Sequence, residues 1–170
     1  MKKTIVPKLK WIPEELFAQI QKNMPIACVD LLVLRKKAGH IETLLIKRKI
    51  YPEIGKWCLI GGRILKDEYT KDTIRRQARE ELGVSVTIIP PWSEIMPFAV
   101  FNDPVSDTQK HFVVLAYPVM ITKGTLNATG PEFSEARWFP LNKLPAKIGF
   151  YHPKILAMLS KYIKTKSLSL

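Results

Sequence analysis

Apolar and polar positions along the chain follow helical spacing in three stretches. Between Pro13 and Pro25, apolar residues recur three or four positions apart after a start that carries proline and two glutamates. The stretch 69–82 contains neither glycine nor proline, and Gly83 follows it in the place of a helix cap. The pattern predicts a short N-terminal helix, a central helix over 69–82 and a C-terminal helix over about 153–164, whose apolar residues share one stripe.

Other segments carry runs rich in valine, leucine and isoleucine that are bounded by glycine, proline or charged residues. Such runs are typical of β-strands. The predicted strands cover 26–34, 42–46, 57–60, 86–89, 95–101 and 111–121, with a turn at 36–40 and a loop at 102–110. Helices and strands together predict a single α/β or α+β domain.

Length, charge and cysteine content narrow the class of protein. A chain of 170 residues with 46% apolar residues can bury one sizeable core but is too short for two ordinary domains. Its net charge of +12 attracts anions. The longest apolar run, 112–121, is about half of the roughly 20 residues that span a bilayer, and no signal-peptide pattern is present, so we expect a cytoplasmic protein. Cys28 and Cys58 lack metal-site spacing, which predicts free buried thiols.

The central helix presents a face suited to a hard divalent cation. Gln77, Glu80 and Glu81 lie three and four positions apart, so they share one side of the helix. Neighbouring carboxylates repel each other unless a cation lies close to both, and Mg²⁺ prefers oxygen ligands. From these residues alone the alternative is a solvated face, because Arg76 and Glu80 are spaced as an ion pair.

The spacing around this helix carries a more specific signal. Gly62 is followed after five residues by Glu68 and after seven more by Arg76, and the helix ends in Glu-Glu-Leu-Gly. Over 62–84 this order resembles the signature of the Nudix hydrolases, with Gln77 at the one position where that family usually carries glutamate.

The resemblance implies a fold, a cofactor and a substrate class. The fold would be the Nudix fold, a mixed β-sheet sandwiched between helices, in one domain over 1–170 with an N-terminal helical extension over 1–25. The cofactor would be Mg²⁺ or Mn²⁺, which neutralises and orients a diphosphate. The substrate would be a small-molecule nucleoside diphosphate linked to another group.

The same resemblance assigns roles to individual residues. It implies Glu80 and Glu81 as catalytic, metal-binding carboxylates, the Gly61 carbonyl and Gln77 as further metal ligands, and Gly62, Glu68 and Arg76 as structural support. Because an amide is a neutral and poorer ligand that cannot act as a base, Gln77 predicts fewer metals or a base elsewhere.

Outside this segment the chain is most similar to the GDP-mannose mannosyl hydrolases. The similarity extends over about 12–160 and consists of short matches such as Lys47-Arg48. The similarity implies phosphate contacts by Arg48 and Arg63, whose guanidinium groups suit bidentate binding, and a homodimer. Asp30 interrupts an apolar strand, where an unpaired carboxylate is costly, so we assign it to substrate binding.

The general base and the bond that is cut stay open. The mannosyl hydrolases use a loop histidine, and Phe133 falls at about its place, so Glu132 or Glu135 would replace it, with His152 as a weaker candidate. The leading prediction is a hydrolase that releases nucleoside diphosphate and sugar from a GDP-mannose-like substrate. The alternatives are a pyrophosphatase that cuts the P–O–P bond of a substrate such as ADP-ribose, or a non-catalytic nucleotide- or RNA-binding module. RNA has little support, because no aromatic RNA-binding motif is present.

Overall fold

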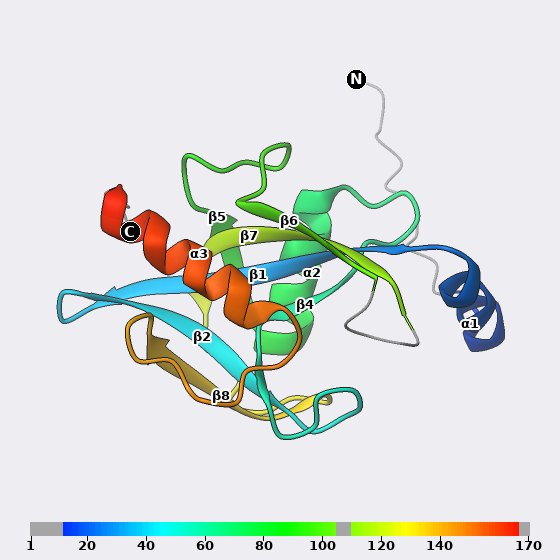
Figure 1. The fold of residues 1–170 in the computed structure, drawn as a ribbon, viewed down its shortest axis with the longest axis horizontal. Coiled ribbons are helices and arrows are strands. Elements are labelled where there is room, and N and C mark those ends of the chain that lie inside the picture. Colours follow the sequence, from blue (N-terminus) through cyan, green and yellow to red (C-terminus); the bar gives the residue numbers. More distant parts are fainter. Residues whose placement is uncertain (1–11, 105–109, 167–170) are drawn as a thin grey trace.

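A mixed β-sheet with helices on both faces forms the body of the protein (Figure 1). The computed structural model describes residues 12–104 and 110–166. In chain order the elements are α1 (Glu14–Asn23), β1 (Ile26–Lys37), β2 (His40–Arg48), β3 (Trp57–Cys58), β4 (Ile60–Arg63), α2 (Thr70–Leu82), β5 (Val84–Ile88), β6 (Ala99–Asp103), β7 (Phe112–Gly124), β8 (Phe133–Pro140) and α3 (His152–Thr165). The predicted α+β architecture is confirmed.

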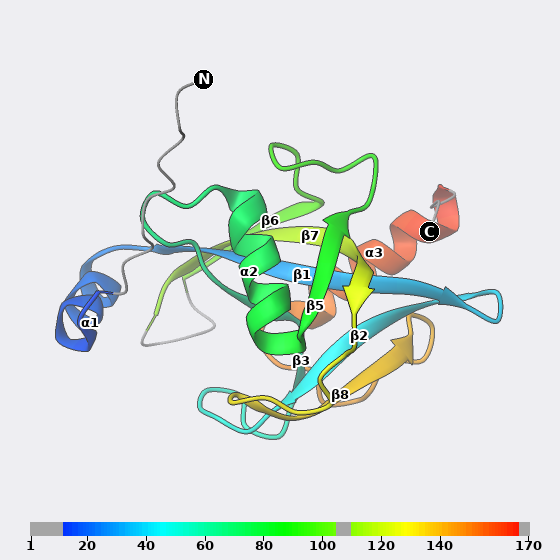
Figure 2. The ribbon, with the colours of Figure 1, turned by 180° about the vertical axis from the view of Figure 1, so that it is seen from behind.

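The sheet runs in the order β3-β2-β1-β7-β5, with β4 on β1, β6 on β7 and β8 on β2. Strands β1 and β7 are parallel, and the other pairs are antiparallel. Helix α3 crosses one face, and the view from behind shows α2 over the other face (Figure 2).

The long central strand β1 is buried on both faces, which explains its nearly continuous apolar sequence. Alternate side chains of a strand point to opposite faces. Val29, Leu31 and Val33 therefore belong to the core that includes Ile74, Ala78 and Leu82 of α2. Leu32 and Leu34 belong to the core that includes Ile155, Leu156 and Leu159 of α3. The free thiols predicted at Cys28 and Cys58 are confirmed, and both are buried.

The boundaries of the predicted strands differ from the structure, and three of the differences change the picture. The predicted strand 57–60 is divided into β3 and β4, which pair with different neighbours. The prediction of a strand over 95–101 is wrong in its first half, because the chain turns where Ser93 and Met96 exchange backbone hydrogen bonds. Ile95 at the tip of that turn is 94% exposed. The strand predicted over 86–89 begins earlier, at the residue that follows the cap of α2.

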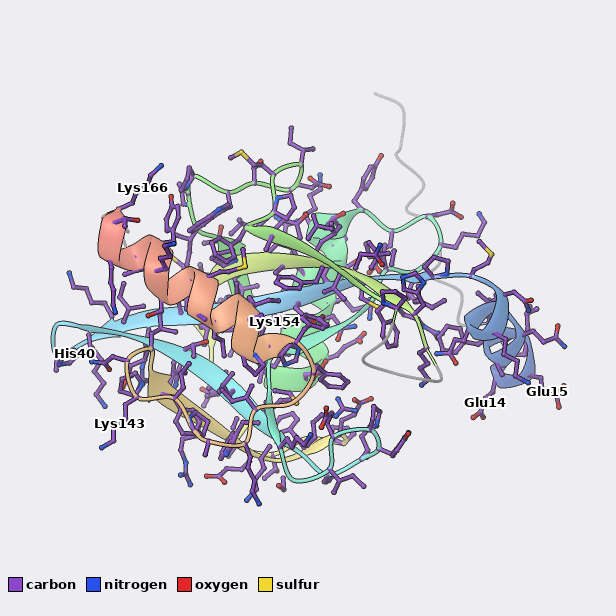
Figure 3. All side chains as sticks on the ribbon, in the orientation of Figure 1. Glu14, Glu15, His40, Lys143, Lys154 and Lys166 are labelled. Carbon is purple, nitrogen blue, oxygen red and sulfur yellow. The ribbon has the colours of Figure 1, made fainter. Side chains whose placement is uncertain are left out.

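Helix α1 lies at one end of the molecule. Figure 3 places Glu14 and Glu15 of α1 at the opposite end from His40, which marks the tip of the β1–β2 hairpin. No residue of α1 is buried. Residues 1–11 of the predicted extension lie outside the described part, and the homodimer stays a prediction. In the described part, no helix is long and apolar enough to cross a membrane.

Candidate active site

A cavity of about 310 Å³ gathers several of the predicted site residues. Its walls come from α1, β1, β4, β7, the segment after β2, the loop before β8 and the start of α3. The charged side chains that line it are Asp30, Arg48, Arg63, Lys110 and Glu132. The cavity thus combines three cationic groups, which suit a diphosphate, with two carboxylates.

Two adjacent glycines bring β1 and α2 close to β4. A Cβ atom on Gly61 would lie 2.2 Å from Asp30 Oδ1 and 2.2 Å from the Val29 carbonyl oxygen. A Cβ atom on Gly62 would lie 2.3 Å from the end of the Gln77 side chain. Both separations are far below van der Waals contact, so a side chain at Gly61 would collide with the backbone of β1 and one at Gly62 would displace the Gln77 side chain. The Gly-Gly pair therefore lets Asp30 and Gln77 both lie close against β4.

Gln77 contacts Glu81 directly. Its amide nitrogen donates to Glu81 Oε1 over 2.7 Å, and its amide oxygen accepts from Arg76 Nη1 over 3.0 Å. Gln77 is buried, so these two contacts satisfy groups that water does not reach. They give Gln77 a part in orienting the Glu81 carboxylate, while its predicted role as a metal ligand stays a prediction.

Glu81 carries the strongest electrostatic perturbation among the predicted ligands. Its pKa is raised to about 8, chiefly by burial and next by the nearby charge of Glu132, against the opposing effect of Arg48. Asp30 and Glu80 also raise the pKa of Glu81. Excess negative charge around a partly buried carboxylate is the condition that a bound cation relieves.

The donor set fits a divalent cation. Glu81 lies in the field of three further carboxylates. Within the described residues, however, no three histidine, cysteine, aspartate or glutamate side chains lie close enough together to hold a metal ion. A hard cation also accepts backbone carbonyl and phosphate oxygens, so Glu81, the Gly61 carbonyl and a bound diphosphate would supply the ligands together.

Glu80 and Glu68 both pair with Arg76, in different environments. Glu80 lies 3.4 Å from Arg76 Nη1, with 52% of its side chain exposed. Glu68 accepts from Arg76 Nε over 2.8 Å and from Arg76 Nη2 over 2.9 Å, in a bidentate pair that is almost fully buried. Arg76 Nη2 also donates to the Arg63 carbonyl oxygen over 3.1 Å. Arg76 thus links α2 to the loop before it and to the end of β4.

The two arginines predicted to bind phosphate lie on different walls of the cavity. Arg48 Nε donates to the Pro52 carbonyl oxygen over 3.0 Å, which fixes the guanidinium group. The guanidinium carbon of Arg63 lies 3.9 Å from the ring centroid of Phe17 on α1. Burial lowers the pKa of Arg63, and the charge of Arg76 lowers it further, so an anion beside Arg63 would stabilise its charged form.

The structure separates the two candidate bases on the late loop. Glu132 lines the cavity, and its Oε2 lies 3.7 Å from Arg48 Nη1. Glu135 lies on β8 and pairs with Arg137, and it is not among the residues that line the cavity. Phe133 is fully buried in the core beneath α2. Of the predicted base positions, only Glu132 therefore meets the cavity from this loop.

Two neighbouring residues of the cavity wall were not predicted together. Tyr151 and His152 line the cavity at the start of α3, and both contact Asp30. The sequence analysis predicts His152 only as a weaker candidate for the general base and assigns no role to Tyr151. The available signal was the buried position predicted for Asp30, which requires hydrogen-bond donors from elsewhere in the chain.

The NUDIX domain family model matches residues 24–159. The low-salt glycan biosynthesis protein Agl8 of Haloferax volcanii is 34% identical over 115 residues, which cover 68% of this chain and 71% of that protein. The ADP-ribose pyrophosphatase of Methanocaldococcus jannaschii is 34% identical over 132 residues, which cover 78% of this chain and 71% of that protein.

A similar solved structure is the MutT NUDIX hydrolase from Burkholderia pseudomallei. It matches with a TM-score of 0.65 at 25% identity, over 81% of this chain and 99% of that chain. The family match spans the predicted signature and every described wall of the cavity except α1. The chain therefore belongs to the Nudix family and is a Nudix hydrolase.

Proposed function

We propose that this enzyme hydrolyses a nucleoside diphosphate sugar with the help of Mg²⁺ or Mn²⁺. The observation that carries the proposal is the single cavity that combines Arg48 and Arg63 with the carboxylates of Asp30 and Glu132, beside Glu81. Arginine side chains bind the diphosphate, and carboxylates accept hydrogen bonds from sugar hydroxyls. The names of the two relatives described above support this substrate class, since one is a glycan biosynthesis protein and the other an ADP-ribose pyrophosphatase.

The chain's own residues would divide the work between binding and proton transfer. A divalent cation held by Glu81 and the Gly61 carbonyl would supply charge neutralisation of the diphosphate and a more acidic water. Arg48 and Arg63 orient the phosphates from two walls. Glu132, on the remaining wall, is positioned to take a proton from water. Asp30 would accept hydrogen bonds from the sugar, as its predicted role in substrate binding requires.

Attack at phosphorus is the favoured reaction, with attack at the sugar carbon as the second candidate. The mannosyl hydrolases that the chain resembles use a loop histidine, whereas Phe133 at that place is buried in the core. His111 pairs with Asn102, and His40 lies at the far tip of a hairpin (Figure 3). The similarity to the GDP-mannose branch keeps the second candidate open.

A substrate panel tests the proposal. Wild-type protein with Mg²⁺ or Mn²⁺ is incubated with GDP-mannose, GDP-glucose, UDP-glucose and ADP-ribose, and we expect metal-dependent product from at least one of them. Hydrolysis in ¹⁸O water then identifies the bond: label in a phosphate shows attack at phosphorus, and label in the free sugar shows attack at carbon. Absence of metal-dependent product from the whole panel would contradict the proposal.

Metal should stabilise the protein more at high pH than at low pH. The folded-state pKa of Glu81, about 8, lies above the ordinary value of 4.5, so the metal-free folded protein binds a proton that the unfolded chain releases. Stability of the metal-free protein therefore falls as pH rises from about 5 to about 8. A cation binds the ionised carboxylate and offsets this loss.

The measurement is Tm with EDTA and with Mg²⁺ at several pH values in that window. We expect the increase in Tm caused by Mg²⁺ to grow with pH in the wild type and to be small at every pH in Glu81→Gln. An increase that is equal in both proteins would place the metal away from Glu81.

A further inference from the structure

The start of α3 contacts Asp30 of β1. The Tyr151 hydroxyl donates to Asp30 Oδ2 over 2.6 Å, and His152 Nε2 lies 3.1 Å from the same oxygen. These partners are separated by 121 and 122 positions in sequence. One carboxylate oxygen of Asp30 is thus engaged by two neighbouring side chains of the cavity wall.

The orientation of His152 follows from a second contact. The Leu59 backbone N–H donates to His152 Nδ1 over 3.0 Å, and a backbone amide can only donate. Nδ1 therefore accepts, and the ring proton lies on Nε2, where it is donated to Asp30. Because His152 is only 3% exposed and both ring nitrogens have partners, it is unsuited to act as a general base.

The residue before this pair is held in an unusual backbone conformation. Phe150 has φ 53°, which is rare for a bulky side chain. Its N–H donates to Glu53 Oε1 over 3.1 Å, and its ring centroid lies 5.6 Å from the guanidinium carbon of Arg48. Strained backbone persists only where surrounding contacts determine it. The contacts around Phe150 therefore fix the entry into α3 and the direction of the two side chains that follow.

The remaining oxygen of Asp30 lies beside β4. Asp30 Oδ1 approaches Gly61 so closely that a Cβ atom there would lie 2.2 Å away. Arg48, Arg63 and Lys110 supply positive charge for phosphate, whereas a carboxylate repels it. A neutral group that carries hydroxyls is the part of a nucleotide sugar that suits the surroundings of Asp30.

We propose that Tyr151 and His152 are positioning residues that hold the Asp30 carboxylate in place for the hydroxyl groups of the substrate's sugar. The start of α3 is then part of the sugar site. This inference rests on the proposed function, because it concerns the sugar of a nucleoside diphosphate sugar. A positioning role requires that loss of the two donors weakens binding of the sugar and leaves binding of the diphosphate unchanged.

Calorimetry separates the two effects. Binding of GDP-mannose is compared with GDP, and ADP-ribose with ADP, in a Glu81→Gln background with Mg²⁺ so that hydrolysis does not interfere. In the parent protein, we expect at least one sugar-bearing ligand to bind more tightly than its diphosphate. Tyr151→Phe should weaken binding of that ligand about tenfold, since it deletes one hydrogen bond to a charged acceptor. Binding of the diphosphate should not change. Absence of a preference in the parent protein would overturn the inference.

Matched variants distinguish positioning from folding. His152→Leu removes both ring contacts, whereas His152→Gln keeps one acceptor and one donor, so Gln should restore most of the affinity that Leu loses. Tyr162→Phe is the control, because it deletes a tyrosine hydroxyl from α3 at a ring that packs against Trp92. It should leave both affinities unchanged. Equal losses for both ligands, or no rescue by Gln, would overturn the inference. Failure of the wild-type substrate panel would contradict the proposed function alone, because these affinities do not depend on turnover.

Discussion

Glu81→Gln should lower kcat for metal-dependent hydrolysis by about 10²–10⁴-fold, the range expected when a group that controls proton transfer or its metal is lost. Glutamine has nearly the same shape as glutamate and can still accept from the Gln77 amide, which lies 2.7 Å from Glu81 Oε1. It cannot supply the negative charge that a cation requires. The loss should therefore appear in kcat and in the Mg²⁺ concentration needed for half-maximal rate. It should not appear in Tm measured with EDTA at about pH 5, where the raised pKa of Glu81 has not yet lowered the stability of the wild type.

Glu80→Gln is the matched control for this prediction. Glu80 neighbours Glu81 on the same helix, but half of its side chain is exposed and it pairs with Arg76 at 3.4 Å. Water screens such an exposed group, so we expect a loss of about tenfold or less. If Glu80→Gln lost as much activity as Glu81→Gln, both carboxylates would contribute similarly to metal binding. If Glu81→Gln kept full activity, the proposed site would be wrong.

The sequence predicted the central elements of the fold because their patterns are local. The absence of glycine and proline over 69–82, followed by Gly83, predicts α2 and its left-handed cap, which has φ 73° in the structure. The turn at Ile95 was wrongly predicted as strand because this apolar residue, although exposed, continues the apolar run that follows it. The turn depends on backbone hydrogen bonds between Ser93 and Met96, which hydrophobic patterning does not show.

The candidate site was predictable where it depends on spacing along one segment. Gly62, Gln77 and Glu81 belong to the family signature, and in the structure Gly62 lies against Gln77, which contacts Glu81. Contacts between distant segments were not predictable, because they depend on how α3 docks on the sheet. Tyr151 and His152 illustrate this limit, since the N-cap and first residue of α3 supply the partners of Asp30 from more than 100 residues away.

The largest effect on stability should come from the buried pair of Arg76 and Glu68. Their side chains are 5% and 1% exposed, and two hydrogen bonds join them. Arg76→Ala leaves the Glu68 carboxylate without its cation in a site that excludes water, which costs about 3–5 kcal/mol of unfolding free energy. The same change removes the bond to the Arg63 carbonyl, so the cavity wall at the end of β4 should loosen as well.

The pH dependence gives this prediction a second readout. Burial alone would raise the pKa of Glu68, but the hydrogen bonds from Arg76 and the Leu65 N–H outweigh it, so the pKa lies below its ordinary value. A carboxyl whose folded pKa is depressed stabilises the protein above its ordinary pKa and loses that contribution as pH falls. Urea unfolding should therefore show a smaller acid-induced loss of stability in Arg76→Ala than in the wild type.

Arg75→Ala controls for the loss of an arginine from α2. Arg75 pairs with Asp72 at 3.5 Å, with most of its side chain exposed, so its removal should change the unfolding free energy by about 0.5 kcal/mol or less. A similar small change for Arg76→Ala would mean that water reaches Glu68 and replaces the lost guanidinium. A large loss confined to Arg76→Ala would show that this one buried cation holds together the loop before α2, that helix and the end of β4. The geometry of the neighbouring site depends on this arrangement.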